Sequence, residues 1–430
     1  MFIKHNYPMR DFINRSKEIE LLNRLKAKAG LVVVYGRRRV GKSRLLRDWL
    51  KQSGGCYSQS IEGSTNLQIE QLYKDLAGSL STKIVPKSWE ELFQLIEHEN
   101  APLSICIDEF PYLVASDPTL ASRLQRWIDS STKRNLLLIL AGSSRRMMFD
   151  LFLDDNAPLY GRAHRIIQLE PMSYQNFCEA LKLDSTVLDS FLKFSLVGGI
   201  PKYWELINPH DDVLAMAQDL YFDFAPFMQG EPRRILRDEK LDDINPASVL
   251  EIVGRGAERP SEIAARLQTK HQNLSRVLQH LMQANLLSRE IPFGSNIKDA
   301  KRTVYKIADP AMRFWYRVYS PHQSLWSSYT KQHKQQLIYD NASSLFEENV
   351  RARFPGAGRY WESNLEIDIV APTTSGKKEL LVGEVKFTEL SAAKRQSLLQ
   401  ELEQKWRATK LASKFKVSEY RVFDVGELGG

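Results

Sequence analysis

The sequence contains little cysteine and no long apolar run, and both absences narrow the class of protein. Only three of its 430 residues are cysteines, and their wide separation matches no metal-binding spacing. The longest apolar stretches, such as NLLLILAG at residues 135–142, are far too short to cross a bilayer. The first twelve residues, MFIKHNYPMRDF, hold no apolar segment of the kind that a secretion signal needs. We therefore expect a cytoplasmic protein without disulfide bonds and without a membrane partner.

Low-complexity linkers and internal repeats are also missing, although the chain is too long for one hydrophobic core. We expect about two to four domains. The net charge is +8, and residues 250–320 concentrate it, with 12 lysines and arginines against 6 aspartates and glutamates. Such a local excess is typical of a surface that binds an acidic partner, and nucleic acid, in particular DNA, is the partner that we expect.

A phosphate-binding loop is predicted near the start of the chain. The segment LVVVYGRRRVGKSRLL contains G-x-x-x-x-G-K-S between a β-branched run and a helical pattern. Glycines let successive backbone N–H groups close around phosphate oxygens at a helix N-terminus. Lys42 would reach the β- and γ-phosphates, and the Ser43 hydroxyl would ligate Mg²⁺. The predicted ATP-binding residues of the loop are Gly36, Arg37, Arg38, Arg39, Val40, Gly41, Lys42 and Ser43.

Such a loop also needs acidic and polar groups at the ends of neighbouring strands. The strand in PLSICIDEFPYL ends in Asp108, which would hold Mg²⁺ through water, and Glu109, which would orient or deprotonate the attacking water. The next strand ends in Ser143, where a polar group can sense the γ-phosphate. Arg162, in PLYGRAHRI, could reach that phosphate in the same subunit or in a neighbouring one, or it could be a surface charge.

These segments, together with FINRSKEIELL, AGSSRRMM and GGIPKYW, resemble the archaeal-type ATPase family, which is related to the STAND class of P-loop NTPases. The resemblance covers about residues 11–227. It implies that Phe12 and Arg15 help to seat the base of ATP. It also implies that GGIP at residues 198–201 links the nucleotide state to domain arrangement. From the residues alone, GGIP is a helix break followed by a rigid turn.

Residues 259–290 have the pattern of a helix-turn-helix. Apolar residues recur at helical spacing from Leu274 to Met282 and predict a buried stripe, whereas the opposite face is polar. The following FGSNIKDAKRTVYKI predicts a basic hairpin wing. A helix of this kind can lie in the major groove of DNA, although winged helices also serve as packing modules between domains. The predicted nucleic-acid contacts are Lys270, Asn273, Arg276, Lys298, Lys301 and Arg302.

Two neighbouring apolar strands near the C-terminus, in NLEIDIVAP and LLVGEVKF, carry charged residues. Because side chains alternate along a strand, Glu384 and Lys386 share a face, and Asp368 can converge on them. An acid, a strand turn and acid-x-lysine form the signature of the PD-(D/E)xK nuclease fold. Here Glu-Ile-Asp stands in place of the Pro-Asp of the name. Asp368 and Glu384 would bind Mg²⁺, with Glu347 from the preceding helix completing the shell.

Lys386 would position the attacking water or stabilise the developing negative charge. Residues 343–423 also resemble the restriction-endonuclease-like domain of unknown function that is often fused to these ATPases. An ordinary surface ion pair between Glu384 and Lys386 is the alternative interpretation.

The predicted fold is α/β and multidomain. It comprises a P-loop NTPase parallel sheet at residues 1–165, a helical lid at 166–240, a winged helix-turn-helix at 241–325 and a restriction-endonuclease-like α/β domain at 335–430. We expect ATP and Mg²⁺ as cofactors, and the chain could form a homo-oligomer. One function that fits is an ATP-hydrolysing switch coupled to a metal-dependent nuclease. The other is an ATP-dependent DNA-binding regulator or scaffold whose nuclease fold does not cut. A small-molecule kinase would leave the C-terminal half without a role.

Overall fold

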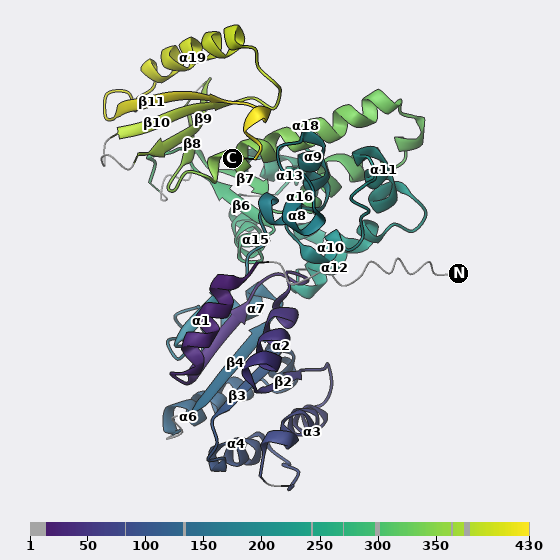
Figure 1. Ribbon diagram of the computed structural model, residues 1–430, viewed down its shortest axis with the longest axis vertical. Coiled ribbons are helices and arrows are strands. Elements are labelled where there is room, and N and C mark those ends of the chain that lie inside the picture. The colour runs from purple at the N-terminus through teal and green to yellow at the C-terminus, as the bar shows by residue number, and fades with distance from the viewer. Residues whose placement is uncertain are drawn as a thin grey trace. The chain divides into compact units, whose positions relative to one another are not determined.

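The chain divides into two compact structural units. The first contains residues 1–172 with the short segments 200–202 and 237–241, and the second contains the remaining residues. Figure 1 shows the chain as a computed structural model. The described residues are 14–81, 83–131, 135–241, 244–269, 271–296, 302–362, 364–373 and 379–429.

A five-stranded parallel sheet in the order β2-β3-β4-β1-β5 forms the centre of the first unit. Its strands are β1 (Gly30–Tyr35), β2 (Cys56–Gln59), β3 (Leu103–Asp108), β4 (Leu136–Gly142) and β5 (Arg165–Gln168). Every residue of β3 and β4 is buried, as expected where both faces of a parallel sheet are covered. The predicted parallel-sheet core is therefore confirmed.

Helices cover this sheet and follow the strands in alternation (Figure 1). They are α1 (Ser16–Lys26), α2 (Lys42–Ser53), α3 (Thr65–Leu76), α4 (Trp89–His98), α5 (Phe110–Ser116), α6 (Leu120–Ser130) and α7 (Arg145–Phe152). Because the strands are parallel, the carboxyl ends of β1, β3 and β4 lie at one edge of the sheet. That edge is where ligands bind in open α/β sheets.

The second unit begins with a group of helices that contains α8 (Tyr174–Leu181), α9 (Leu188–Val197) and α11 (Val213–Ala217). The short helices α10 (Pro201–Trp204) and α12 (Glu231–Asp238) run across the boundary between the units. A glycine is required at Gly198, where φ is +60° and an added Cβ would lie 2.9 Å from the ring of Pro310. The predicted helix break at GGIP is thus present, between α9 and α10.

Three helices and a two-stranded antiparallel sheet occupy the middle of the second unit. They are α13 (Ile244–Gly254), α14 (Pro260–Arg266), α15 (His271–Gln283), β6 (Leu287–Glu290) and β7 (Val304–Ile307). On α15 the side chains of Leu274, Leu278 and Leu281 are buried, whereas Arg276 and Gln279 are exposed. The amphipathic pattern predicted for this helix is therefore present over its described side chains.

The C-terminal part of the second unit is a four-stranded mixed sheet in the order β11-β10-β9-β8. Its elements are α18 (Lys331–Arg351), β8 (Gly358–Glu362), β9 (Leu365–Pro372), β10 (Glu379–Val385), α19 (Ala392–Arg407) and β11 (Lys416–Phe423). The pairs β8–β9 and β9–β10 are antiparallel, and β10–β11 is parallel. Leu402 and Trp406 of α19 pack on the sheet residues Ile367 and Val382.

Aromatic packing joins the predicted lid to the C-terminal part of the chain. The ring of Phe191, on α9, lies 5.6 Å from that of Phe346 on α18 and 5.8 Å from that of Phe387, measured between centroids. Rings at such distances share one apolar core. The two units are thus coarser than the four predicted domains, whose boundaries remain predictions.

In the described part of the chain, no helix is long and apolar enough to cross a membrane.

Candidate functional site

The loop between β1 and α2 has the backbone that a phosphate-binding loop needs. A Cβ added at Gly36 would lie 2.4 Å from the carbonyl oxygen of Leu169, so no other residue fits there. Gly41 has a φ of +101° and directly precedes α2, whose first residue is Lys42. The loop therefore ends at a helix N-terminus, whose dipole favours a bound anion.

Lys42 is almost fully buried and connects the loop to the end of β4. Its ammonium donates to the carbonyl oxygens of Gly36 (2.8 Å) and Arg37 (3.2 Å) and to the Ser143 hydroxyl oxygen (3.1 Å). Burial lowers the pKa of Lys42, and the carboxylates of Glu109 and Asp108 oppose this shift. A phosphate at this position would supply the charge that stabilises the buried ammonium.

Asp108 and Glu109 follow β3 at the same edge of the sheet. Asp108 is fully buried and accepts a hydrogen bond of 2.6 Å from the hydroxyl of Tyr57. Glu109 has a left-handed backbone (φ 54°) and accepts from both the backbone N–H (3.0 Å) and the hydroxyl of Ser143. The structure thus brings Lys42, Asp108, Glu109 and Ser143 together, as the sequence predicts.

Tyr57, on β2, is a residue of this site that the sequence does not reveal. Its hydroxyl bonds to Asp108 and also interacts with the Ser43 side chain, so it joins the two predicted Mg²⁺ ligands. Burial, followed by the charge of Asp108, raises the pKa of Tyr57 above its usual value, and the group is therefore a neutral donor at physiological pH. Oxygen atoms of a carboxylate and a hydroxyl are ligands that suit Mg²⁺.

The Arg15 side chain supports the loop from the α1 side. Its guanidinium donates to the carbonyl oxygens of Val40 (3.3 Å) and Glu170 (2.7 Å), and the residue is buried. These bonds tie the loop to the chain that follows β5. The role predicted for Arg15 in seating the base remains a prediction, and Phe12 lies outside the described residues.

Residues 237–241 approach the loop from a distant part of the sequence. Asp238 forms an ion pair of 2.7 Å with the exposed Arg38. Glu239 is buried, and its carboxylate accepts from the Ser144 hydroxyl (3.0 Å) and from the backbone N–H groups of Arg145 and Arg146 (both 3.2 Å). The Glu239 carboxylate thus binds the N-terminus of α7, whose cap residue Ser144 directly follows Ser143.

A cavity of about 370 Å³ lies between these groups. Arg38, Glu109, Ser143 and Asp238 contribute to its lining. Burial raises the pKa of Glu239, whereas its backbone hydrogen bonds lower it. No motif in the sequence marks Glu239, because its partners lie almost a hundred residues away.

Arg162 is not brought to the loop. It precedes β5, and its guanidinium binds Asp129, at the end of α6, with distances of 3.0 and 2.9 Å to the two carboxylate oxygens. His164 pairs with Leu31 near the start of β1, so Arg162 lies toward the amino ends of the strands, opposite to the loop. Contact with a nucleotide in a neighbouring subunit remains a prediction.

Two neighbouring carboxylates, the buried Glu384 and the partly buried Asp368, lie on adjacent strands of the C-terminal sheet. Asp368 of β9 accepts a 2.8 Å hydrogen bond from the backbone N–H of Val385, one residue beyond Glu384 of β10. Burial, followed by the charge of Glu384, raises the pKa of Asp368 to about 6. The two acids predicted as metal ligands are therefore neighbours.

Two lysines neutralise Glu384. Lys386 donates to its Oε1 at 2.8 Å, and Lys405 of α19 donates to both carboxylate oxygens at 3.1 and 3.2 Å. The Lys386 ammonium remains partly exposed, with 37% of the side-chain surface accessible. Lys405 was not predicted, because helical spacing alone does not show that α19 packs beside β10.

Glu347 of α18 is close enough to Asp368 for the charge of Asp368 to act on it, but Glu347, Asp368 and Glu384 do not form one ligand group. In the described ranges, no group of three or more His, Cys, Asp and Glu side chains could hold a metal ion. Burial, followed by the charge of Asp368, raises the pKa of Glu347 to about 7, and Lys306 and Arg351 oppose the shift. Mg²⁺ often binds through only one or two carboxylates and keeps several waters, so Asp368 and Glu384 fit it without Glu347.

The raised pKa of Glu347 predicts a pH-dependent effect on stability. The folded state holds the proton more tightly than the unfolded state, so the free energy of unfolding falls as pH rises from about 4.5 to about 7. We expect Glu347→Gln to remove this fall and to stabilise the chain at pH 8 by roughly 1–3 kcal/mol, with little effect near pH 4.5. Chemical denaturation at both pH values measures this difference, with the surface variant Glu403→Gln as control. An equal effect at both pH values would contradict the prediction.

The predicted nucleic-acid contacts are only partly described. Arg276 and Arg302 are both exposed, and Arg302 hydrogen-bonds to Tyr360 of β8. Lys270, Lys298 and Lys301 lie outside the described residues, as does the side chain of Asn273. Nucleic-acid binding by these residues remains a prediction.

Comparison with known proteins agrees with the structure of the first unit. Residues 12–207 match the model of an ATPase domain predominantly from Archaea. Residues 315–398 match a family described as Archaea bacterial proteins of unknown function. The resemblance to an archaeal-type ATPase domain is therefore confirmed for residues 12–207.

Similar proteins have been found in archaea. The uncharacterized protein MJECL04 of Methanocaldococcus jannaschii is 27% identical over 405 residues, which cover 88% of each chain. The uncharacterized ATP-binding protein MJ0423 of the same organism is 48% identical over 42 residues, 9% of this chain and 71% of that one. The Walker-type ATPase Paby2304 of Pyrococcus abyssi is 22% identical, with a TM-score of 0.53 over 72% of this chain and 97% of that one. This likeness concerns the fold alone. Together with the loop geometry, the match over residues 12–207 identifies this segment as a P-loop ATPase domain of the archaeal type.

Proposed function

We propose that this protein is an ATP-hydrolysing switch coupled to an Mg²⁺-dependent nuclease-like site that acts on nucleic acid. The observation that carries the proposal is that the partly buried Asp368 lies beside the buried Glu384, with the ammonium of Lys386 2.8 Å from Glu384. Glu384 already pairs with Lys386 and Lys405, but a second carboxylate beside it costs free energy unless a further cation compensates its charge. A bound metal ion would supply that compensation.

The side chains have separate roles in this proposal. Asp368 and Glu384 would hold Mg²⁺, which polarises a phosphodiester and makes hydroxide available near neutral pH. The N–H of Val385 fixes one oxygen of Asp368, so the carboxylate is already oriented. Lys386 is partly exposed and sits beside the acids, where it can stabilise negative charge that develops on the phosphate.

The chain connection between the two units, at residues 237–241, favours control of the nuclease-like site by ATP. Residues 237–241 belong to the first unit, whereas the chain on either side belongs to the second. Asp238 contacts Arg38 of the phosphate-binding loop, and Glu239 contacts the start of α7. A change of either contact on nucleotide binding would act directly on the chain that enters the second unit on each side of residues 237–241.

A cleavage assay tests the proposed function. Labelled single- and double-stranded DNA and RNA are incubated with Mg²⁺ or Mn²⁺, without nucleotide, with ATP and with a non-hydrolysable analogue. We expect cutting that requires the metal and changes with the nucleotide, because the acids need a cation and the loop contacts segment 237–241. Failure to cut any of the four substrates, while ATP hydrolysis proceeds, would contradict the nuclease part of the proposal.

The second candidate function is an ATP-dependent DNA-binding regulator or scaffold with a silent nuclease fold. Glu384 favours this alternative, because Lys386 and Lys405 already neutralise it without a metal. The exposed Arg276 on α15 would then contact DNA without subsequent cleavage. Titration calorimetry separates the two functions, since binding of Mg²⁺ that Asp368→Asn abolishes is expected only for the nuclease site.

A further inference from the structure

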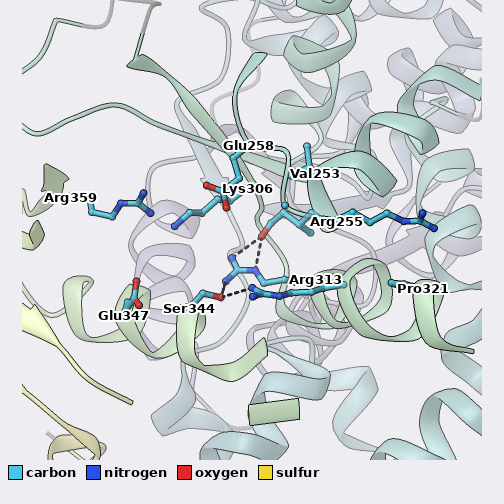
Figure 2. A pocket seen from close by; sticks show the side chains of 13 residues that line it. Val253, Arg255, Glu258, Lys306, Arg313, Pro321, Ser344, Glu347 and Arg359 are labelled. Carbon is cyan, nitrogen blue, oxygen red and sulfur yellow. Dashed lines mark hydrogen bonds between the residues drawn. The ribbon is translucent and has the colours of Figure 1, made fainter. Parts of the chain in front are cut away.

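A cavity of about 500 Å³ lies within the second unit and has no part in the ATP site. Its walls come from the end of α13 and the turn that follows, from β7, α18 and β8, and from the helical segment 313–321. Figure 2 shows the side chains that line it. A volume of this size suits a small ligand rather than one or two water molecules.

Cations dominate the lining of this cavity. The lining contains the cations of Arg255, Lys306, Arg313, Arg317 and Arg359 and the carboxylates of Glu258 and Glu347. Burial raises the pKa of Glu258, and the charges of Lys306 and Arg359 oppose this shift. The ends of Lys306 and Arg359 are directed toward the same space in Figure 2, with Glu347 near it. The cavity is therefore suited to an anion.

Acids that do not line the cavity hold its cations in place. Arg313 is buried and donates to Glu348 and to the carbonyl oxygen of Ile307, both at 2.8 Å. Lys306 lies 3.4 Å from Glu290 and 3.7 Å from Glu348. Because these partners fix the cations before any ligand arrives, little side-chain entropy remains to be lost on binding.

A purely structural ion network is the alternative explanation. Buried ion pairs of that kind are stable only with close packing and satisfied hydrogen bonds, whereas these cations border an open volume. Arg317 is exposed and hydrogen-bonds only weakly to the Ser344 hydroxyl, at 3.5 Å. Arg255 pairs with Glu251 and keeps about half of its side-chain surface accessible. Arg317 can therefore turn toward a ligand without breaking an ion pair, whereas Arg255 would exchange its pair with Glu251 for the ligand.

We propose that this cavity binds a phosphate-bearing ligand of mononucleotide size, either a free nucleotide or one nucleotide of a nucleic-acid strand. Planar guanidinium groups match phosphate oxygens and can bind them in pairs. The carboxylates of Glu258 and Glu347 could accept hydrogen bonds from sugar hydroxyl or base amino groups of the same ligand. The inference does not depend on nuclease activity, although Glu347 is near both sites.

Titration calorimetry with the full chain tests this inference. The chain carries Lys42→Met, so that the phosphate-binding loop does not contribute. The probes are AMP, GMP, CMP, UMP, inorganic phosphate and a ten-nucleotide single strand. We expect at least one nucleotide or the strand to bind, and Arg317→Gln and Arg255→Gln each to weaken that binding about tenfold, the effect of losing one charge-assisted hydrogen bond. Arg407→Gln, a change at the exposed end of α19, is the matched control and should leave binding unchanged.

The probes distinguish the two sources of the phosphate. Binding of a mononucleotide that depends on Arg317 supports a free nucleotide as ligand. Binding of the strand alone, with the same dependence, supports a nucleic-acid phosphate. Binding of none of the probes, or binding that neither arginine variant weakens, would overturn the inference. Circular dichroism shows whether each variant is folded, and Arg317 is suitable because it is exposed.

Discussion

Replacing Lys42 with methionine is expected to lower the rate of ATP hydrolysis by at least about 100-fold, which corresponds to about 2.7 kcal/mol of transition-state stabilisation. The ammonium is buried at the carboxyl edge of the sheet, beside Ser143 and between carbonyl oxygens of its own loop. Methionine has a similar length but no charge, so it cannot stabilise the negative charge on the β- and γ-phosphates. Release of phosphate from ATP under saturating conditions measures the effect.

Lys51→Met is the matched control, because Lys51 lies on the same helix and its side chain is exposed. We expect the control to hydrolyse ATP at the wild-type rate. The Lys42 variant leaves two carbonyl oxygens without their donor, and we expect a loss of about 1–3 kcal/mol in stability. Thermal melting monitors this change, so that a loss of activity is not confused with unfolding. Hydrolysis that continues at the wild-type rate in a folded Lys42→Met chain would contradict the assignment of the site.

Replacing Asp368 with asparagine is expected to reduce metal-dependent cleavage by about 100-fold or more, because the metal loses one of its two carboxylates. Asparagine has the same shape, and its side-chain oxygen can still accept the hydrogen bond from Val385. The rate of cleavage of the substrate that the wild type cuts fastest is the measurement. A rate that stays within a few-fold of wild type would refute the role of Asp368.

The same substitution, Asp368→Asn, is also expected to change the free energy of unfolding. The pKa of Asp368 is about 6 in the folded chain and lower in the unfolded chain, so its ionised form destabilises the fold above pH 6. At pH 8 we therefore expect Asp368→Asn to be as stable as the wild type or more so, by on the order of 1–3 kcal/mol. Glu366→Gln is the control, because Glu366 lies on the same strand but is about half exposed. A clear loss of stability at pH 8 would indicate that the carboxylate has a structural role.

The ATPase domain could be predicted because its signals are local. The segment from β1 to α2 requires glycine at Gly36 and Gly41, a lysine at the helix start and an apolar strand before them, all within about twenty residues. Acidic residues at the end of β3 and a serine after β4 follow from the same rule, since parallel strands present their carboxyl ends at one edge. Strand alternation likewise places Glu384 and Lys386 on one face.

Contacts between distant segments could not be predicted, because periodicity shows which face of an element is buried but not what covers it. Glu239 reaches α7, Tyr57 joins Asp108 to Ser43, and Lys405 binds Glu384, all through packing that no motif specifies. The same limit explains Arg162, whose pairing with Asp129 depends on how α6 lies beside the start of β5. The sequence by itself determined the chemistry available at each strand end. Only the tertiary structure decided which charges compensate one another, because that depends on distances between elements far apart in the chain.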